Sequence, residues 1–414
     1  MNLLIAPQYP YPANHAVVNT VYEDLLPSRG HTVHMIRPHV GVDRVQRQDA
    51  PWGNGSLVVY PDEPLGGRLE NIARAVRQTR WVKRAFRQFD EVPIDAILVR
   101  NDLVTAFAAR DCARRRGIPF IYQLSSPDAE FVIRQGRERG GLAGAYSLVR
   151  GWSGLAARRR VSRRAAAVLA ISDAMRTHLV ADDGVDADKV FSFPMGVVDD
   201  DVSEDDVDEL RHRLNLPVGR TIVYVGVLDA VRQPEWMLDV LDRVRARVPD
   251  AALLVVTYQT DERRRAFEDE ARRRQTDVRV VGPVPFRDIS RYLRCADVMM
   301  SPYPPMAEHT VASPTKSIEA LCAALPVVGS AEVDEHAAIF AASGGGLAVA
   351  WDTDAFAGAI VSLLERPDER RRMGEQGRRW VLAHRTYAHL TDYLERILEA
   401  STSPVALSAL PHAP

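Results

Sequence analysis

Residues 221–226 have the sequence Thr-Ile-Val-Tyr-Val-Gly, a short run in which consecutive positions are apolar or β-branched. Such a run is typical of a strand that is covered on both faces of a parallel sheet. It follows an acidic stretch, residues 199–209, which interrupts a regular alternation of short apolar runs and helical patterns. Alternating strands and helices predict parallel sheets built by right-handed crossovers. The new start at residue 221 therefore predicts a second α/β domain.

The same alternation runs through both halves of the chain. The predicted strands of the first half are residues 3–6, 32–36, 57–60, 96–99, 120–124, 168–171 and 190–193. Those of the second half are residues 221–226, 252–257, 278–281, 298–300, 327–329 and 347–350. We predict an α/β protein with two doubly wound, Rossmann-like domains that face each other across a cleft. The expected parts are a domain over 1–197, a linker region over 198–218, a domain over 219–399 and a flexible tail over 400–414.

Composition and charge narrow the functional classes. The 414 residues are 46% hydrophobic and 26% charged, as in ordinary globular proteins. A balance of 53 Lys and Arg against 55 Asp and Glu argues against a dedicated nucleic-acid binder. Three scattered cysteines fit neither a disulfide framework nor a zinc site, and no apolar run approaches the ~20 residues that span a bilayer. We expect a cytoplasmic protein.

One basic stretch of the sequence is compatible with a peripheral membrane contact. Residues 150–164 contain six arginines and Trp152. Such a stretch fits an anionic lipid surface at the inner face of the membrane. It also fits the solvated face of a helix that leads into the predicted strand at 168–171, which is the interpretation we favour.

The segment Ser313-Pro314-Thr315-Lys316-Ser317-Ile318-Glu319 is the most informative about chemistry. Ser313 as N-cap and Pro314 at the first helical position predict a helix start, and a helix N-terminus is a natural seat for phosphate. Lys316, one of three lysines, falls in the first turn, where the helix dipole ordinarily favours an acid, so a bound anion would explain it. Glu319 lies one turn on and can take ribose hydroxyls. The alternative is an ordinary helix with a surface Lys–Glu pair.

This segment resembles the donor-binding helix of the retaining nucleotide-sugar transferases of glycosyltransferase family 4, which have the GT-B fold. The family pattern is approximately Ser-Pro-x-Lys-x-x-Glu-x-x-Ala-x-Gly-x-Pro-Val-Val. Further blocks are similar to the family in the same order along the chain: residues 29–33, 170–175, 194–199, 224–229 with Arg232, 281–285 and 289–298. The resemblance covers nearly the whole chain and is strongest in the second domain.

The resemblance implies a transferase that moves a sugar from a nucleotide-diphosphate sugar to a hydroxyl-bearing acceptor with retention of anomeric configuration. By family frequency the donor is UDP-linked, and neither a metal nor another cofactor is expected. The acceptor stays unidentified: a glycan, a glycolipid or a small-molecule natural product. Two alternatives stay open, namely a nucleotide-sugar epimerase and a catalytically impaired, nucleotide-binding partner subunit of another transferase.

The resemblance also assigns residues on the donor side. Lys316 and Arg232 would be the catalytic cations on the diphosphate, and Glu319 would bind the ribose. The expected donor-nucleotide site comprises Gly226, Ser313, Pro314, Thr315, Lys316 and Glu319.

The chain departs from the family pattern at three positions of the second domain, one of which is Thr257 in place of a glycine. Val311 stands where the family often has Glu, and Val227 stands where it has Arg. Glu308 and His309, in the same loop as Val311, are candidates for contact with the donor sugar, with a simple loop role as the alternative.

The acceptor side is expected in the first domain. Asn14, His15 and Asp128 all follow predicted strands of this domain and should face the cleft. Loop residues satisfied by the backbone are the alternative for each of them.

Overall fold

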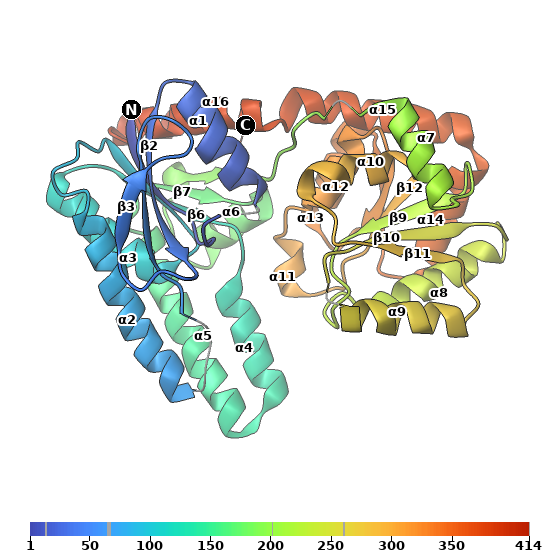
Figure 1. The fold of residues 1–414 in the computed structure, drawn as a ribbon, viewed down its shortest axis with the longest axis horizontal. Helices are drawn as coiled ribbons and strands as arrows, with labels where there is room; N and C mark the ends of the chain where they lie inside the picture. Colours follow the sequence, from blue (N-terminus) through green and yellow to red (C-terminus); the bar gives the residue numbers. More distant parts are fainter. Residues whose placement is uncertain (13–14, 64–67, 201, 260, 414) are drawn as a thin grey trace. The chain divides into compact units, whose positions relative to one another are not determined.

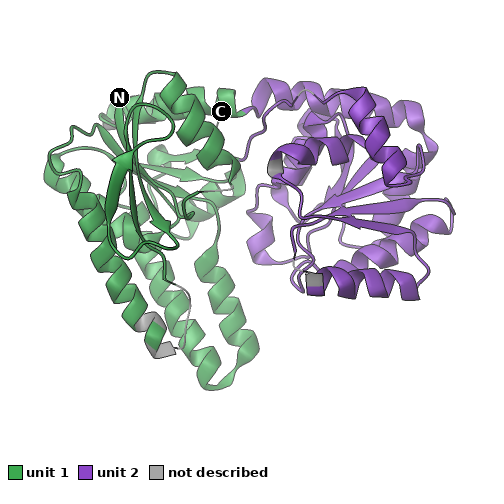
Figure 2. Cartoon of the chain, in the orientation of Figure 1, with its two compact units in different colours: residues 1–194, 387–414 green, residues 195–386 purple. Residues whose placement is uncertain are grey.

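The chain folds into two compact units, each built on one sheet (Figure 2). The structure is a computed structural model that describes residues 1–12, 15–63, 68–200, 202–259 and 261–413. Unit 1 comprises residues 1–194 and 387–414, and unit 2 comprises residues 195–386.

Unit 1 contains an eight-stranded sheet in its described residues (Figure 1). The strands lie in the order β3-β4-β2-β1-β5-β6-β7-β8, and every neighbouring pair is parallel except β3 and β4. Their bounds are β1 Asn2–Ala6, β2 Thr32–His39, β3 Gln46–Asp49, β4 Ser56–Pro61, β5 Ala96–Arg100, β6 Phe120–Leu124, β7 Ala167–Ala170 and β8 Val190–Ser192.

The helices of unit 1 connect these strands, and two more come from the C-terminal end of the chain. Their bounds are the π-helical η1 Val17–Leu25, α1 Leu26–Ser28, α2 Arg68–Arg87, α3 Leu103–Arg116, α4 Asp128–Arg139, α5 Gly141–Ser162, α6 Asp173–Ala181, the 3-10 helix η2 Ala187–Lys189, α16 Tyr387–Ala400 and α17 Pro404–Ser408. The long helices α4 and α5 pack tightly along each other (Figure 1). A Cβ at Gly144 would lie 2.5 Å from the carbonyl oxygen of Gly136, so glycine permits this close approach.

Unit 2 contains a six-stranded, all-parallel sheet in the order β11-β10-β9-β12-β13-β14. Its strands are β9 Thr221–Val225, β10 Ala252–Val256, β11 Val278–Val281, β12 Val298–Ser301, β13 Val327–Ser330 and β14 Gly346–Val349. Its helices are α7 Glu204–Arg213, α8 Pro234–Arg245, α9 Asp261–Arg273, η3 Phe286–Asp288, α10 Ile289–Arg294, α11 Ala307–Thr310, α12 Thr315–Cys322, α13 Asp334–Ser343, α14 Thr353–Glu365 and α15 Pro367–His384.

Strand β9 shows why residues 221–225 have to be apolar or β-branched at consecutive positions. Ile222 and Tyr224 pack into one hydrophobic core, whereas Val223 and Val225 pack into a second one on the opposite face. Because successive side chains of a strand point to opposite faces, a strand buried on both sides must be apolar throughout. The predicted doubly wound architecture is confirmed for both units.

Each sheet has one point where the strand order reverses. In unit 1, β1 lies between β2 and β5, and in unit 2, β9 lies between β10 and β12. The loops that leave the carboxyl ends of β1 and β5, or of β9 and β12, run in opposite directions from the sheet. In doubly wound folds, ligands usually bind at this point.

The division of the chain differs from the expected one at three places. The segment 387–414 belongs to unit 1, where Arg29 forms ion pairs with Asp392 and Glu395 of α16. Part of the expected linker is α7, whose Ser203 N-cap accepts from the N–H of Asp206. The expected flexible tail includes α17. The amphipathic period of α16 predicts a helix but does not say which sheet it packs against.

Among the described residues, no helix is both long enough and apolar enough to cross a bilayer.

Candidate functional site

The loop after β9 starts at the reversal point of the unit 2 sheet and leads to Arg232. Gly226 donates its N–H to the carbonyl of Val256 at the end of β10, at 3.0 Å. A Cβ at Gly226 would lie 2.6 Å from the hydroxyl of Tyr224, which donates to the carbonyl of Val227 at 2.8 Å. Glycine is needed here because the tyrosine folds back over the loop.

Tyr303, in the loop after β12, contacts two of the candidate residues of unit 2, Arg232 and His309. The guanidinium carbon of Arg232 lies 4.2 Å from the centroid of its ring, a cation–π arrangement. His309 and His336 pack edge-on against the same ring, with centroids at 5.2 and 5.6 Å. The sequence singled out Arg232 and His309 but missed Tyr303, because an aromatic residue between prolines carries no distinguishing pattern.

A buried histidine connects Tyr303 to helix α12. His336 Nε2 lies 2.9 Å from the hydroxyl of Ser317 on α12 and 3.3 Å from that of Ser301 at the end of β12. Its Nδ1 lies 3.1 Å from the carbonyl oxygen of Ser330 at the end of β13. Burial lowers the pKa of His336 to about 4, so the ring is neutral at pH 7 and donates from Nδ1. The network fixes α12 against two strands of the sheet.

Helix α12 begins at Thr315, one residue later than predicted. Pro314 occupies the N-cap position and no side chain caps the helix. The expectation that Ser313 is the N-cap was wrong, because its hydroxyl accepts a hydrogen bond from the N–H of Met195 at 3.2 Å instead. Ser313 thus ties the start of the helix to the segment that opens unit 2.

Lys316 and Glu319 form an ion pair on one face of α12. Lys316 Nζ lies 2.9 Å from Glu319 Oε2 and 3.2 Å from Oε1. The two side chains are 24% and 13% exposed, so the pair is not the surface pair of the alternative interpretation. Burial raises the pKa of Glu319, and the charge of Lys316 opposes that rise. Without a ligand, the cation in the first turn is neutralised by its own helix.

A small pocket adjoins the Glu319 end of this pair. It is lined by Val197, Val198, Asp199, Asp200, Ile289, Ser290, Arg294, Glu319, Cys322, Ala323 and Arg378. Asp199, from the acidic stretch noted in the sequence, pairs with Arg378 at 2.9 Å. In the described part of the chain, no three His, Cys, Asp or Glu side chains are grouped to hold a metal ion.

The two candidates for sugar contact lie on the short helix α11. His309 is buried, and its Nδ1 lies 2.7 Å from the carbonyl oxygen of Pro304, which orients the ring within the loop. Glu308 precedes it and is half-buried. Val311 caps the helix and is buried, so the position where the family often has Glu belongs here to the apolar interior.

The acceptor-side candidates belong to unit 1, and no contact in the described part of that unit joins His15 to Asp128. His15 stacks on Tyr9 with centroids 4.1 Å apart, and burial together with the charge of Arg100 lowers its pKa to about 3. Asp128 is exposed in the first turn of α4, and no hydrogen bond or ion pair within residues 15–63 and 68–200 joins it to His15. Asn14 lies outside the described residues.

Asn101, missed by the sequence reasoning, ties together the loops around the reversal point of unit 1. It follows β5 at a φ of +61°, a conformation that asparagine tolerates. Its side-chain amide donates to Gln8 at 3.0 Å and to the hydroxyl of Ser125 at 2.6 Å, and its oxygen accepts from the N–H of Ser125 at 2.8 Å. The polar Arg-Asn-Asp that follows the apolar run 96–99 was an available signal.

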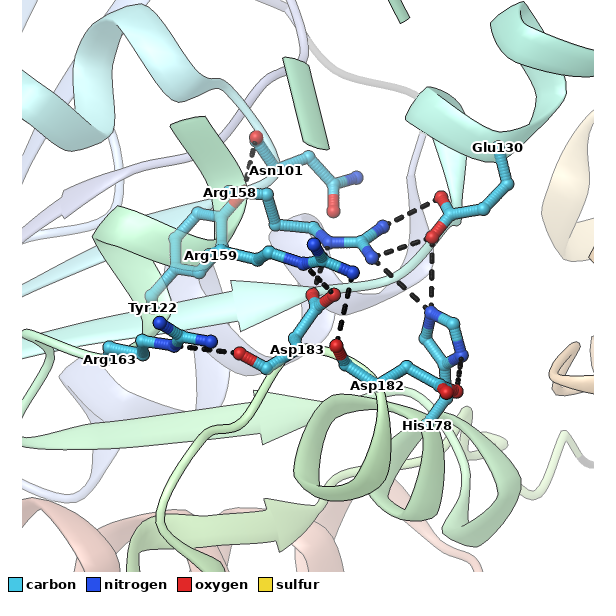
Figure 3. Close-up of polar contacts among 9 residues, drawn as sticks. All are labelled: Asn101, Tyr122, Glu130, Arg158, Arg159, Arg163, His178, Asp182 and Asp183. Atoms are coloured by element: carbon cyan, nitrogen blue, oxygen red, sulfur yellow. Dashed lines mark hydrogen bonds and ion pairs between the residues drawn. The ribbon is translucent and has the colours of Figure 1, made fainter. Parts of the chain in front are cut away.

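The basic stretch of the sequence contains a buried ion network rather than a uniformly solvated face (Figure 3). Arg158 is 3% exposed, donates two hydrogen bonds to Glu130 at 2.6 and 2.7 Å and contacts Asp183 at 2.8 Å. His178 joins the same Glu130 at 3.1 Å, and Arg159 joins Asp183 at 3.0 Å. With its charges paired, the network fastens α4, α5 and the end of α6 together.

Two family models match the chain, one in each unit. Residues 21–196 match a glycosyl transferase 4-like domain, and residues 219–366 match the glycosyl transferases group 1. The chain carries the two domains of a GT-B glycosyltransferase. The matches confirm the predicted fold class and the assignment as a glycosyltransferase.

Several solved structures have the GT-B fold and are similar to this chain over nearly its whole length. Sucrose-phosphate synthase from Thermosynechococcus elongatus is 17% identical, with a TM-score of 0.74 over 96% of this chain and 98% of that one. HepE from Anabaena, in complex with UDP-glucose, is 13% identical, with a TM-score of 0.69 over 96% and 100% of the chains. The α,α-trehalose-phosphate synthase (UDP-forming) from Burkholderia vietnamiensis is 15% identical, with a TM-score of 0.66 over 96% and 100%. Comparison with curated proteins gives no match.

Proposed function

We propose that the protein transfers a sugar from a UDP-linked donor to a hydroxyl-bearing acceptor, with retention of anomeric configuration. The observation that carries the proposal is the contact between Arg232 and Tyr303 at the reversal point of the unit 2 sheet, where such folds bind ligands. The titles of two similar structures support the choice of nucleotide, since they name a complex with UDP-glucose and a UDP-forming synthase.

The proposed diphosphate ligands are Arg232 and Lys316. No ion pair of the described residues includes Arg232, and the carboxylate whose charge acts on it is that of Asp229 in the same loop. A series of contacts runs from Arg232 to Tyr303, from Tyr303 to His336 and from His336 to Ser317. Ser317 directly follows Lys316 in the sequence. Both cations would then oppose the negative charge that grows on the leaving diphosphate as the glycosidic bond breaks.

Glu319 is proposed to accept from the ribose hydroxyls. A ligand that binds Lys316 through its diphosphate and Glu319 through its ribose has to break the ion pair between the two residues. The contacts with the ligand then replace that ion pair. Because the carboxylate beside Lys316 is committed to the ribose, the proposal gives it no role as a catalytic base or nucleophile. A leaving-group phosphate oxygen would take the acceptor proton instead, which requires no pair of carboxylates of the glycosidase kind.

Calorimetric titration of the full chain with UDP, GDP and dTDP tests the nucleotide. The proposal predicts that UDP binds most tightly, and tighter binding of GDP or dTDP contradicts the UDP assignment. Incubation with UDP-glucose and related donors, followed immediately by ¹H NMR of the released sugar, tests the stereochemistry. An initial α-anomer from an α-linked donor supports retention, and an initial β-anomer contradicts it.

A further inference from the structure

Three arginine side chains are fully buried in the described part of the chain, and all three belong to unit 1. They are Arg37, Arg100 and Arg158, which are 0%, 2% and 3% exposed. A guanidinium stays charged in proteins, so its burial is costly unless an anion and hydrogen-bond acceptors surround it. The surroundings of each side chain therefore show whether its charge is compensated within the protein.

The protein itself supplies an anionic partner to two of the three arginines. Arg158 has the carboxylates of Glu130 and Asp183 (Figure 3). Arg37 pairs with Glu23 at 2.6 Å and donates to the carbonyl oxygens of Tyr9 and Pro10 at 3.2 and 2.6 Å. Both guanidinium groups fix neighbouring segments of the fold, and neither lacks an anionic partner.

Arg100 differs from both. Among the described residues, no carboxylate lies within ion-pair distance of it, and its Nε and Nη1 have no hydrogen-bond partner although both atoms are buried. Its contact with Tyr22 is to a neutral group, because burial raises the pKa of that phenol to about 12. Tyr22 in turn donates to Gln123, which leaves the guanidinium charge uncompensated.

The location of Arg100 is that of a ligand site. It is the last residue of β5, one of the two strands that flank the reversal point of the unit 1 sheet. His15, from the loop after β1, lies beside it, and the buried Nδ1 of His15 also has no hydrogen-bond partner. Asn101, the next residue along the chain, is bonded to the exposed Gln8 and the half-buried Ser125, so the surface lies one residue beyond Arg100 in the sequence.

We propose that the loops at this end of the unit 1 sheet bind an anionic oxygen group, a phosphate or a carboxylate, with Arg100 as its principal ligand. An anion there would satisfy the two unpartnered N–H groups and neutralise the buried charge. If the proposed function is right, on which this last step rests, the group belongs to the acceptor, which is then a phosphorylated or acidic sugar or lipid rather than a neutral glycan.

The test is thermal unfolding of the full chain with saturating UDP, which occupies the donor site, and a series of added compounds at constant ionic strength. Inorganic phosphate, glucose 6-phosphate and glucuronate provide the anion, and glucose is the neutral control. At about ten times its Kd, a binding anion should raise Tm by about 2–4 °C. Free phosphate and glucose 6-phosphate together distinguish a site for the bare ion from one that also accepts the sugar.

The variant Arg100→Met keeps the length of the side chain and removes the charge. It should lose the anion-dependent shift, yet without anions it should unfold at the same temperature as the wild type or higher, because an unpaired buried charge is gone. Arg158→Met is the matched control. It should unfold at a lower temperature, since Glu130 and Asp183 lose their partner, and it should keep the anion shift.

Three results would overturn the proposal. They are an anion shift that persists in Arg100→Met, an anion shift in the wild type no larger than that with glucose, and destabilisation of Arg100→Met as large as that of Arg158→Met. The second result would mean that no anion binds beside Arg100, and the third that Arg100 is structural. UDP titration is a separate readout: its failure contradicts the proposed function and not the anion site.

Discussion

The guanidinium of Arg232 lies 4.2 Å from the ring centroid of Tyr303, and this contact joins the loops that follow β9 and β12. Because these strands flank the reversal point of the unit 2 sheet, the contact places a cation at the expected ligand site. Tyr303 also holds His309 and His336, and through His336 it is connected to α12. The donor-site predictions follow from this arrangement.

Glu319→Ala should weaken UDP binding by about tenfold to a hundredfold, because the ribose hydroxyls lose a charge-assisted acceptor worth ~1.5–3 kcal/mol. Part of the loss is offset, since Lys316 no longer has to leave its ion pair. Calorimetric titration of folded protein measures the effect. The control is Glu369→Ala, which removes an exposed pair of the same spacing with Arg366 at the start of α15 and should leave the Kd unchanged. An unchanged Kd for Glu319→Ala contradicts the ribose assignment.

Turnover should survive EDTA, because the proposed ligands of the diphosphate are cations and helix N–H groups rather than a metal ion. Nucleoside diphosphate release from the donor, measured before and after chelation, gives the answer. Activity that disappears in EDTA and returns with Mg²⁺ or Mn²⁺ would show that a metal is required and would contradict this set of diphosphate ligands.

His336 should make the free energy of unfolding depend on pH in the acid range. Its folded pKa of about 4 lies below the ordinary value of 6.5, so the unfolded state binds the proton first as pH falls. Stability is therefore retained above pH ~6.5 and is lost progressively down to pH ~4, by ~3 kcal/mol at most for this one group. Urea unfolding between pH 7.5 and 4.5 measures it.

The matched comparison for His336 is His336→Gln, which keeps a hydrogen-bonding side chain but cannot take up the proton. Its unfolding free energy should fall less steeply between pH 6.5 and 4.5 than that of the wild type. Parallel pH profiles for the two proteins would show that other groups cause the acid dependence.

The strands and the chemistry-bearing helix could be predicted from the sequence because each is encoded locally. Residues 221–225 are apolar on both faces and became β9, and the Ser-Pro-x-Lys segment became the start of α12. The short strand β3 was missed because its four residues are polar and exposed at the antiparallel edge, where no core requires an apolar pattern.

The contacts that complete the sites depend on tertiary packing and had no local signal. Tyr303 and His336 come from different loops and helices and meet only in the folded unit. The return of α16 to unit 1 is likewise a long-range feature of the fold. The unpartnered state of Arg100 can be recognised only once its neighbours are placed, since Arg37 and Arg158 stand in equally apolar or basic surroundings in the sequence.

The most direct test of the central claim is the rate of UDP release from a UDP-sugar by the wild type, by Arg232→Ala and by Lys316→Ala. Each substitution should lower kcat/KM by roughly 10²–10³, comparable to the loss of one oxyanion donor, while the Kd for UDP rises much less. The double variant should lose less than the product of the two effects, because both cations act on one charge. Near-normal turnover in either single variant would contradict the donor site described here.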